Sequence, residues 1–247
     1  MGKLIGICGG SCTTRRQWAW LLAHAIEDRT KGFDMDTFKE HHTRRVSQLQ
    51  GGDVELYSTN HVILDSFAEF ILDQVKLFNP NLQPYDLTDA YIKHNKYVLI
   101  STGEVMGATE LNEVPHTICS LEQLCKAKCL EAVPGATLTV NNYILYFADH
   151  VIKRYFGKDV WLNATIALNK LMGGIDYRIY WDVKTQGEHD YIKNSGGFII
   201  CLPDEDPFID RYQKIDKLQP DFDLSLVENI LEQPDVFYMT AGQILNH

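Results

Sequence analysis

The sequence has no apolar run that approaches the roughly 20 residues a helix needs to cross a bilayer. Its first residues also lack the features of a secretion signal, because only a few apolar residues follow Lys3 and no small-residue cleavage site comes after them. Six cysteines are present without the spacing of a disulfide framework, which favours reduced thiols. We therefore expect a cytoplasmic protein that is not bound to a membrane.

Positive charge is also scarce. The chain has 23 basic and 33 acidic residues, for a formal net charge of −10. An acidic protein repels polymeric nucleic acid unless its cations are grouped, so DNA and RNA are not expected partners. A mononucleotide needs only a local cationic site, which the overall charge does not forbid. Hydrophobic residues make up 45% of the chain, which is typical of a folded domain rather than a disordered one.

Apolar periodicity predicts an α/β fold with a mostly parallel sheet and helices on both faces, because strand-like segments are separated by helical ones. We expect strands at 3–8, 54–57, 97–100, 177–181, 197–202 and 236–239. Helices are predicted at 15–27, 34–48, 60–78, 120–131, 139–156, 159–170 and 186–194, with a further segment at 224–232 before the last strand. Residues 1–247 are expected to form one domain. The less regular stretch 79–135, interrupted by prolines, is predicted to be an insertion that forms a lid over a substrate cleft.

The first predicted strand, turn and helix have the frame of a phosphate-binding loop, G-x-x-x-x-G-K-[ST]. In this frame Gly9 is the first glycine. Thr14 then stands in place of the second glycine, Arg15 in place of the lysine, and Arg16 in place of the hydroxyl residue. Ligands of parallel sheets collect where strands end and helices begin, so we expect an anion site here.

Several later segments share the motifs of one enzyme family. The sequence Tyr155-Phe156-Gly157-Lys158-Asp159-Val160-Trp161-Leu162-Asn163-Ala164 follows a long predicted helix, and Asp182-Val183-Lys184, Glu188 and Gly196-Gly197 form a strand–helix–strand pattern. Together they resemble the deoxynucleoside monophosphate kinases of tailed bacteriophages, which have the P-loop kinase fold. The resemblance spans most of the chain except about 79–135.

This resemblance implies phosphoryl transfer from ATP, with Mg²⁺, to a nucleoside monophosphate, in the host cytoplasm if a phage encodes the protein. It implies Arg15 and Asp182 as catalytic residues, and Asn141, Trp161 and Lys184 on the substrate side. The implied ATP-binding residues are Gly9, Gly10, Ser11, Thr13, Thr14, Arg15 and Arg16. We assign no metal-ligating residues. Cys119, Cys125 and Cys129 with His116 have irregular spacing for zinc, and free thiols are favoured.

Two phosphate-binding elements depart from the family pattern. Thr14 is β-branched, a poor residue for a left-handed turn, and Arg15 is longer and forked where lysine is expected. In addition, Asn141 occupies the place of an arginine that the family carries early in its long helix. Three hypotheses are therefore open: an active kinase with a remodelled loop, a catalytically inactive kinase-fold protein that binds a nucleotide or a protein partner or pairs with itself, and a kinase fold that takes another phosphate-bearing substrate.

Overall fold

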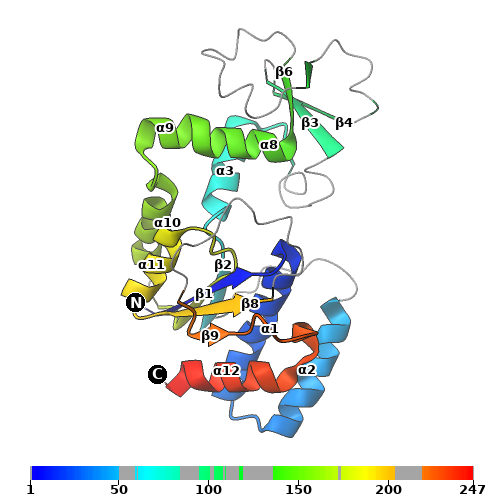
Figure 1. Ribbon diagram of the computed structural model, residues 1–247, viewed down its shortest axis with the longest axis vertical. Coiled ribbons are helices and arrows are strands. Elements are labelled where there is room, and N and C mark those ends of the chain that lie inside the picture. Colours follow the sequence, from blue (N-terminus) through cyan, green and yellow to red (C-terminus); the bar gives the residue numbers. More distant parts are fainter. Residues whose placement is uncertain are drawn as a thin grey trace. The chain divides into compact units, whose positions relative to one another are not determined.

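The computed structural model describes residues 2–49, 59, 61–83, 95–100, 103–107, 109, 117–118, 136–171, 174–203 and 219–246. The chain forms two compact units (Figure 1). Unit 1 consists of Met1–Phe67 and Thr165–His247, and unit 2 of Ala68–Ala164. Unit 2 thus contains the whole of the 79–135 segment. The lid role of that segment stays a prediction.

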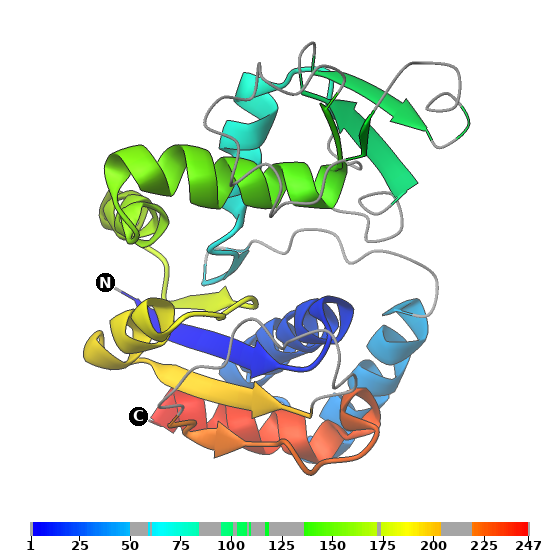
Figure 2. The same ribbon diagram turned by 45° about the horizontal axis from the view of Figure 1, so that its top comes forward.

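Unit 1 is built on a five-stranded sheet in which every pair of neighbouring strands is parallel. Its strands are β1 (Lys3–Gly9), β2 (Val62–Asp65), β7 (Tyr177–Tyr180), β8 (Phe198–Leu202) and β9 (Phe222–Asp223), in the spatial order β2-β7-β1-β8-β9. The first strand of the unit therefore lies at the centre, between its third and fourth (Figure 2). The predicted α/β class is confirmed, and this order is consistent with a nucleoside monophosphate kinase-like P-loop fold.

Helices cover both faces of this sheet. Ile5 and Ile7 on β1 share a core with Trp18 of α1 (Cys12–Thr30) and Phe237 of α12 (Pro234–Asn246). Gly6 lies between them and points the other way, because a Cβ there would stand 2.6 Å from Cδ1 of Ile192 on α11 (Gln186–Asn194). Helix α2 (Met35–Leu49) packs on α1 and α12. The predicted helices at 15–27, 34–48 and 186–194 are confirmed.

The predicted helix at 60–78 is wrong in its first half. Residues Val62–Asp65 form β2, and helix α3 begins only at Glu69 and ends at Phe78. The four strand residues alternate between buried and partly buried and pair with β7, with Val62 opposite Tyr177. Apolar residues at 63, 67, 70 and 71 happen to fit helical spacing, but pairing with a buried neighbouring strand decides the backbone conformation.

The predicted last strand at 236–239 is also wrong, because these residues lie in α12. Pro234 is the first residue of this helix, where its missing N–H costs nothing, and Asp235 follows in the first turn. Phe237, Ala241 and Ile244 are fully buried at spacings of four and three, which is one face of a helix. The last strand of the sheet is β9, which precedes the predicted segment 224–232.

Unit 2 has its own sheet and its own core. The sheet has the order β4-β3-β6-β5, formed by β3 (Lys96–Leu99), β4 (Glu104–Gly107), β5 (Thr117–Ile118) and β6 (Ala136–Thr139). Helix α8 (Val140–Leu145), a π-helical stretch (Tyr146–Ile152) and α9 (Lys153–Phe156) follow, and then α10 (Val160–Leu171), which continues into unit 1. The predicted strand at 97–100 and helices at 139–156 and 159–170 are confirmed. The predicted strand 54–57 and helix 120–131 lie outside the described residues.

Within the described part of the chain, no helix combines the length and the apolar character that a membrane span requires.

Candidate functional site

The turn between β1 and α1 is much tighter than the sequence frame suggests. Strand β1 ends at Gly9, and α1 begins at Cys12 with Ser11 as its N-cap. Gly9 and Gly10 are both left-handed, with φ of 71° and 61°. A Cβ at Gly9 would lie 2.3 Å from the carbonyl oxygen of Leu202 on β8, so only glycine fits there. Two consecutive left-handed glycines therefore reverse the chain at once into the helix.

This geometry corrects the assignment of residues 9–16 to a phosphate-binding loop. Thr14, Arg15 and Arg16 belong to the first turns of α1 and do not lie in a loop. Thr14 has helical backbone angles, so the strain predicted for a β-branched residue at a left-handed position is absent: among the described residues, only Asn229 has positive φ without being glycine. A phosphate loop needs several residues of bare backbone to surround a phosphate group, and here only Gly10 and Ser11 separate strand from helix.

The hydroxyl groups at the start of α1 bond to each other. Ser11 Oγ accepts a hydrogen bond from the backbone N–H of Thr14 at 3.0 Å, and the two hydroxyl oxygens lie 2.8 Å apart. This is an N-cap interaction, which supplies a partner for an N–H group that the helix itself leaves unpaired. Thr13, one residue earlier, is exposed. The cap explains why serine and threonine stand at these positions.

Arg15 is turned back onto the loop. Its side chain is buried, with 4% of its surface exposed. Nη1 donates hydrogen bonds to the carbonyl oxygens of Gly9 at 3.0 Å and of Gly10 at 2.7 Å. Hydrogen bonds from a charged donor are stronger than neutral ones. The guanidinium group therefore holds the left-handed turn closed, in the position where an ATP-binding loop would hold a phosphate group.

Asp182 lies at the same edge of the sheet, two residues after β7. It is buried, with 2% of its surface exposed, and both of its carboxylate oxygens accept hydrogen bonds from the turn that follows β2. Oδ2 lies 2.6 Å from Ser66 Oγ, and Oδ1 lies 2.8 Å from the backbone N of Phe67. The carboxylate thus links the segment after β7 to the turn after the neighbouring strand β2 by hydrogen bonds.

Glu188, which belongs to the strand–helix–strand pattern in the sequence, is a further acidic residue near Asp182. With Thr185 it forms a capping box at the start of α11, and its Oε2 also accepts from the backbone N–H of Lys184 at 2.7 Å. The pKa of Glu188 is raised to about 7, mainly by burial and in addition by the negative charge of Asp182, although hydrogen bonds from Lys184 and Thr185 act in the opposite direction. The Thr-x-x-Glu spacing was visible in the sequence, whereas the proximity to Asp182 was not.

Replacing Glu188 with glutamine should remove a pH dependence of stability. The folded pKa of about 7 lies above the ordinary value of 4.5, so the neutral carboxyl stabilises the fold below pH 4.5, and this contribution is lost as pH rises through 7. Relative to wild type, Glu188→Gln should match at pH 4.5 and gain about 2–3 kcal/mol at pH 8. Urea denaturation at both pH values measures this. Glu228→Gln, which changes an exposed carboxylate, serves as the control. A gain that is the same at both pH values would contradict the assignment.

The remaining predicted residues divide between the units. Lys184 belongs to unit 1, in the segment after β7, with a partly buried side chain. Asn141 lies in the first turn of α8, whose N-cap Thr139 accepts from the backbone N–H of Asn142 at 3.2 Å. Trp161 is buried in the core of unit 2 beside Val75 and Val98. The cysteine group at 119, 125 and 129 lies outside the described residues.

The residues of the turn do not fit ATP and Mg²⁺ bound in the P-loop manner. The backbone between strand and helix is too short to surround a phosphate group. The arginine in the lysine position is bonded to two loop carbonyls, the hydroxyls of Ser11 and Thr14 are bonded to each other, and Arg16 replaces the metal-binding hydroxyl. Among the residues that the structure describes, no three histidine, cysteine or acidic side chains are grouped so that they could hold a metal ion.

Comparison with protein-family models and with curated proteins gives no match for this chain.

Proposed function

We propose that this protein is a nucleoside monophosphate kinase-like protein that does not transfer phosphate from ATP and serves as a binding protein. The observation that carries this proposal is the closed β1–α1 turn, in which the Arg15 guanidinium bonds to the carbonyl oxygens of Gly9 and Gly10. Phosphoryl transfer depends almost entirely on positioning and charge stabilisation of the phosphates, so a site that cannot hold the β- and γ-phosphates cannot catalyse it.

The sequence resemblance suggests the class of ligand, a nucleoside monophosphate. The proposal also includes a cytoplasmic location, the host cytoplasm if a phage encodes the protein, and leaves polymeric nucleic acid out as a partner because the net charge is −10. The other candidate ligand is a protein partner, which includes a second copy of this chain.

A second candidate function, an active phosphotransferase with a remodelled loop, is favoured by the strand order and by the two acidic residues beside it. Asp182 and Glu188 lie where β7 ends, the edge at which parallel sheets of this class bind their ligands. A carboxyl with a pKa near 7 is suited to proton transfer at neutral pH. This candidate requires ATP and Mg²⁺ to bind in a pose different from that of a P-loop.

Purified protein mixed with ATP, Mg²⁺ and the four deoxynucleoside monophosphates should yield no diphosphate product above background, measured by ion-exchange chromatography. Calorimetry with ATP and Mg²⁺ at millimolar concentration should show no binding. Asp182→Asn, purified in the same way, is the control, because a kinase carried over from the expression host gives equal product with both proteins. Product that forms with wild type and disappears with this variant would establish the second candidate in place of the first.

A further inference from the structure

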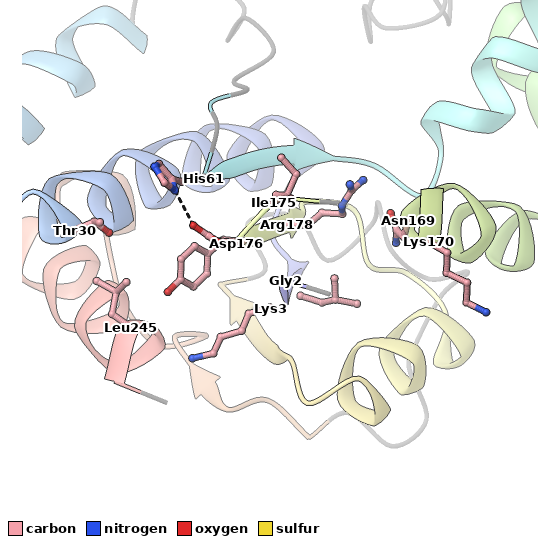
Figure 3. Close-up of a pocket in the computed structure, with 13 residues that line it drawn as sticks. Gly2, Lys3, Thr30, His61, Asn169, Lys170, Ile175, Asp176, Arg178 and Leu245 are labelled. Carbon is pink, nitrogen blue, oxygen red and sulfur yellow. Dashed lines mark hydrogen bonds and ion pairs between the residues drawn. The ribbon is translucent and has the colours of Figure 1, made fainter. Parts of the chain in front are cut away.

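Unit 1 has a hollow of about 810 Å³ at the edge of its sheet where β1 and β7 begin (Figure 3). The side chains of Lys3 and Lys170 line it, but Figure 3 shows them pointing away from each other, so their charges do not converge on one ligand. The fold does bring two reactive groups side by side at the other edge, where β1 and β8 end. These are the thiols of Cys8 and Cys201.

Cys8 and Cys201 are partners in the parallel register of β1 and β8. Partners in such a register point to the same face of the sheet, and neighbouring strands lie about 4.8 Å apart. The register pair two residues earlier shows how close such side chains come, because a Cβ at Gly6 would lie 2.9 Å from Cδ1 of its partner Ile199. A disulfide needs Cα atoms about 4.4–6.8 Å apart, so the pairing of the strands already supplies the spacing.

Both sulfur atoms lie close to the boundary between the two strands. Cys8 Sγ donates a hydrogen bond of 3.4 Å to the carbonyl oxygen of Ile200, the residue before Cys201. Cys201 Sγ lies 3.8 Å from the carbonyl oxygen of Leu202. That oxygen faces β1, because a Cβ at Gly9 would lie 2.3 Å from it. Each thiol therefore contacts a carbonyl group of β8 that is next to β1.

The two thiols differ in their access to solvent. Cys8 is buried, with 4% of its surface exposed, whereas Cys201 is partly exposed. Thiol–disulfide exchange begins at a sulfur that the reagent can reach, and a second thiol beside it can then complete the exchange. We therefore expect Cys201 to react first and Cys8 to react second, with the product formed on Cys201.

We propose that Cys8 and Cys201 form a reversible disulfide, with a low-molecular-weight disulfide such as oxidised glutathione as the oxidant. The Cys201 thiolate attacks the oxidant, so that a mixed disulfide forms and one glutathione leaves as a thiolate. The Cys8 thiolate then attacks the Cys201 sulfur and expels the second glutathione. Two protein thiols are oxidised, one glutathione disulfide is reduced to two thiols, and the protons of the protein thiols pass through solvent to the leaving thiolates. In a reducing compartment the pair stays as thiols.

This cross-link would join the strand ends directly before the closed turn. Gly9 and Leu202, whose contact leaves space only for glycine, each follow one of the two cysteines. Oxidation therefore fixes β1 to β8 beside the turn that Arg15 closes. The inference does not depend on whether the protein binds or phosphorylates a nucleotide, because it uses only the pairing of β1 with β8.

Oxidised glutathione added to the purified full chain under native conditions tests this pair. After the remaining thiols are capped with iodoacetamide, trypsin releases Cys8 in residues 4–15 and Cys201 in residues 194–211, and mass spectrometry should find these two peptides joined. Dithiothreitol should separate them. Residues 4–15 also contain Cys12, so Cys12→Ser is the matched control and should keep the cross-link, whereas Cys8→Ser should lose it.

Cys8→Ser should instead retain glutathione on Cys201, because the thiol beside it on β1 has been removed. Circular dichroism shows whether this change at a buried residue leaves the protein folded. Cys201→Ser, at the more exposed position, is a second variant that should also lose the cross-link. The proposal is overturned if the peptides are not joined in wild type, if they stay joined in Cys8→Ser, or if they join to the same extent in urea, where the strand register is lost.

Discussion

Replacing Arg15 with methionine is expected to lower the free energy of unfolding by about 2–4 kcal/mol, because two loop carbonyls lose their charged donor. Methionine keeps the aliphatic stem and its packing, so the loss measures the hydrogen bonds. Neither wild type nor this variant should bind ATP, since the wild-type guanidinium is bonded to Gly9 and Gly10. Urea denaturation followed by far-UV circular dichroism gives the first quantity, and calorimetry gives the second.

Two further variants sharpen this prediction. Arg15→Lys should fall between wild type and Arg15→Met, because an ammonium group is not shaped to bridge two carbonyls as a guanidinium does. Arg44→Met removes an exposed arginine whose pairing with Glu40 contributes little, so it should change stability by less than about 0.5 kcal/mol. If Arg15→Met instead had wild-type stability and reduced affinity for ATP, Arg15 would be a phosphate clamp, as the sequence resemblance implied.

Replacing Asp182 with alanine is expected to lower the free energy of unfolding by about 2–4 kcal/mol. The Phe67 backbone N–H would lose its acceptor, and Ser66 Oγ would lose its charged partner. Asp182→Asn should cost much less, because the amide oxygen can accept from Phe67 while its nitrogen donates to Ser66. Chemical denaturation of the two variants side by side gives the comparison.

Ser66→Ala is the control for Asp182, since it removes one of the two bonds and leaves the carboxylate in place; its loss should be the smaller. Equal losses for Asp182→Ala and Asp182→Asn would mean that the negative charge itself is required, which would favour a ligand or metal role over the structural one. An unchanged stability in Asp182→Ala would contradict the structural role altogether.

The position of Arg15 also explains how a cation is tolerated in the early turns of a helix. A positive charge near a helix N-terminus is unfavourable by roughly 0.3–1 kcal/mol. In this chain the guanidinium also contacts the carbonyl oxygens of Gly9 and Gly10, which belong to the turn before α1. These two negative dipole ends offset the unfavourable effect of the helix dipole on the arginine.

Much of unit 1 was predictable because its elements carry local signals. The apolar patterns of 3–8 and 197–202 predicted two central strands, and apolar residues at helical spacing predicted the helix at 15–27. The prediction failed at 60–78, where the apolar residues fit helical spacing although the first part is a strand. It also failed at 236–239, because the last strand of the sheet lies earlier in the chain, at Phe222–Asp223.

The sequence alone determined the class of fold, since strands separated by amphipathic helices have few ways to bury their apolar faces other than a covered parallel sheet. Only the tertiary structure decided what the loop residues do. Whether Arg15 faces a phosphate or its own backbone depends on where α1 begins, and that follows from the left-handed pair Gly9 and Gly10 packed against the Leu202 carbonyl of β8.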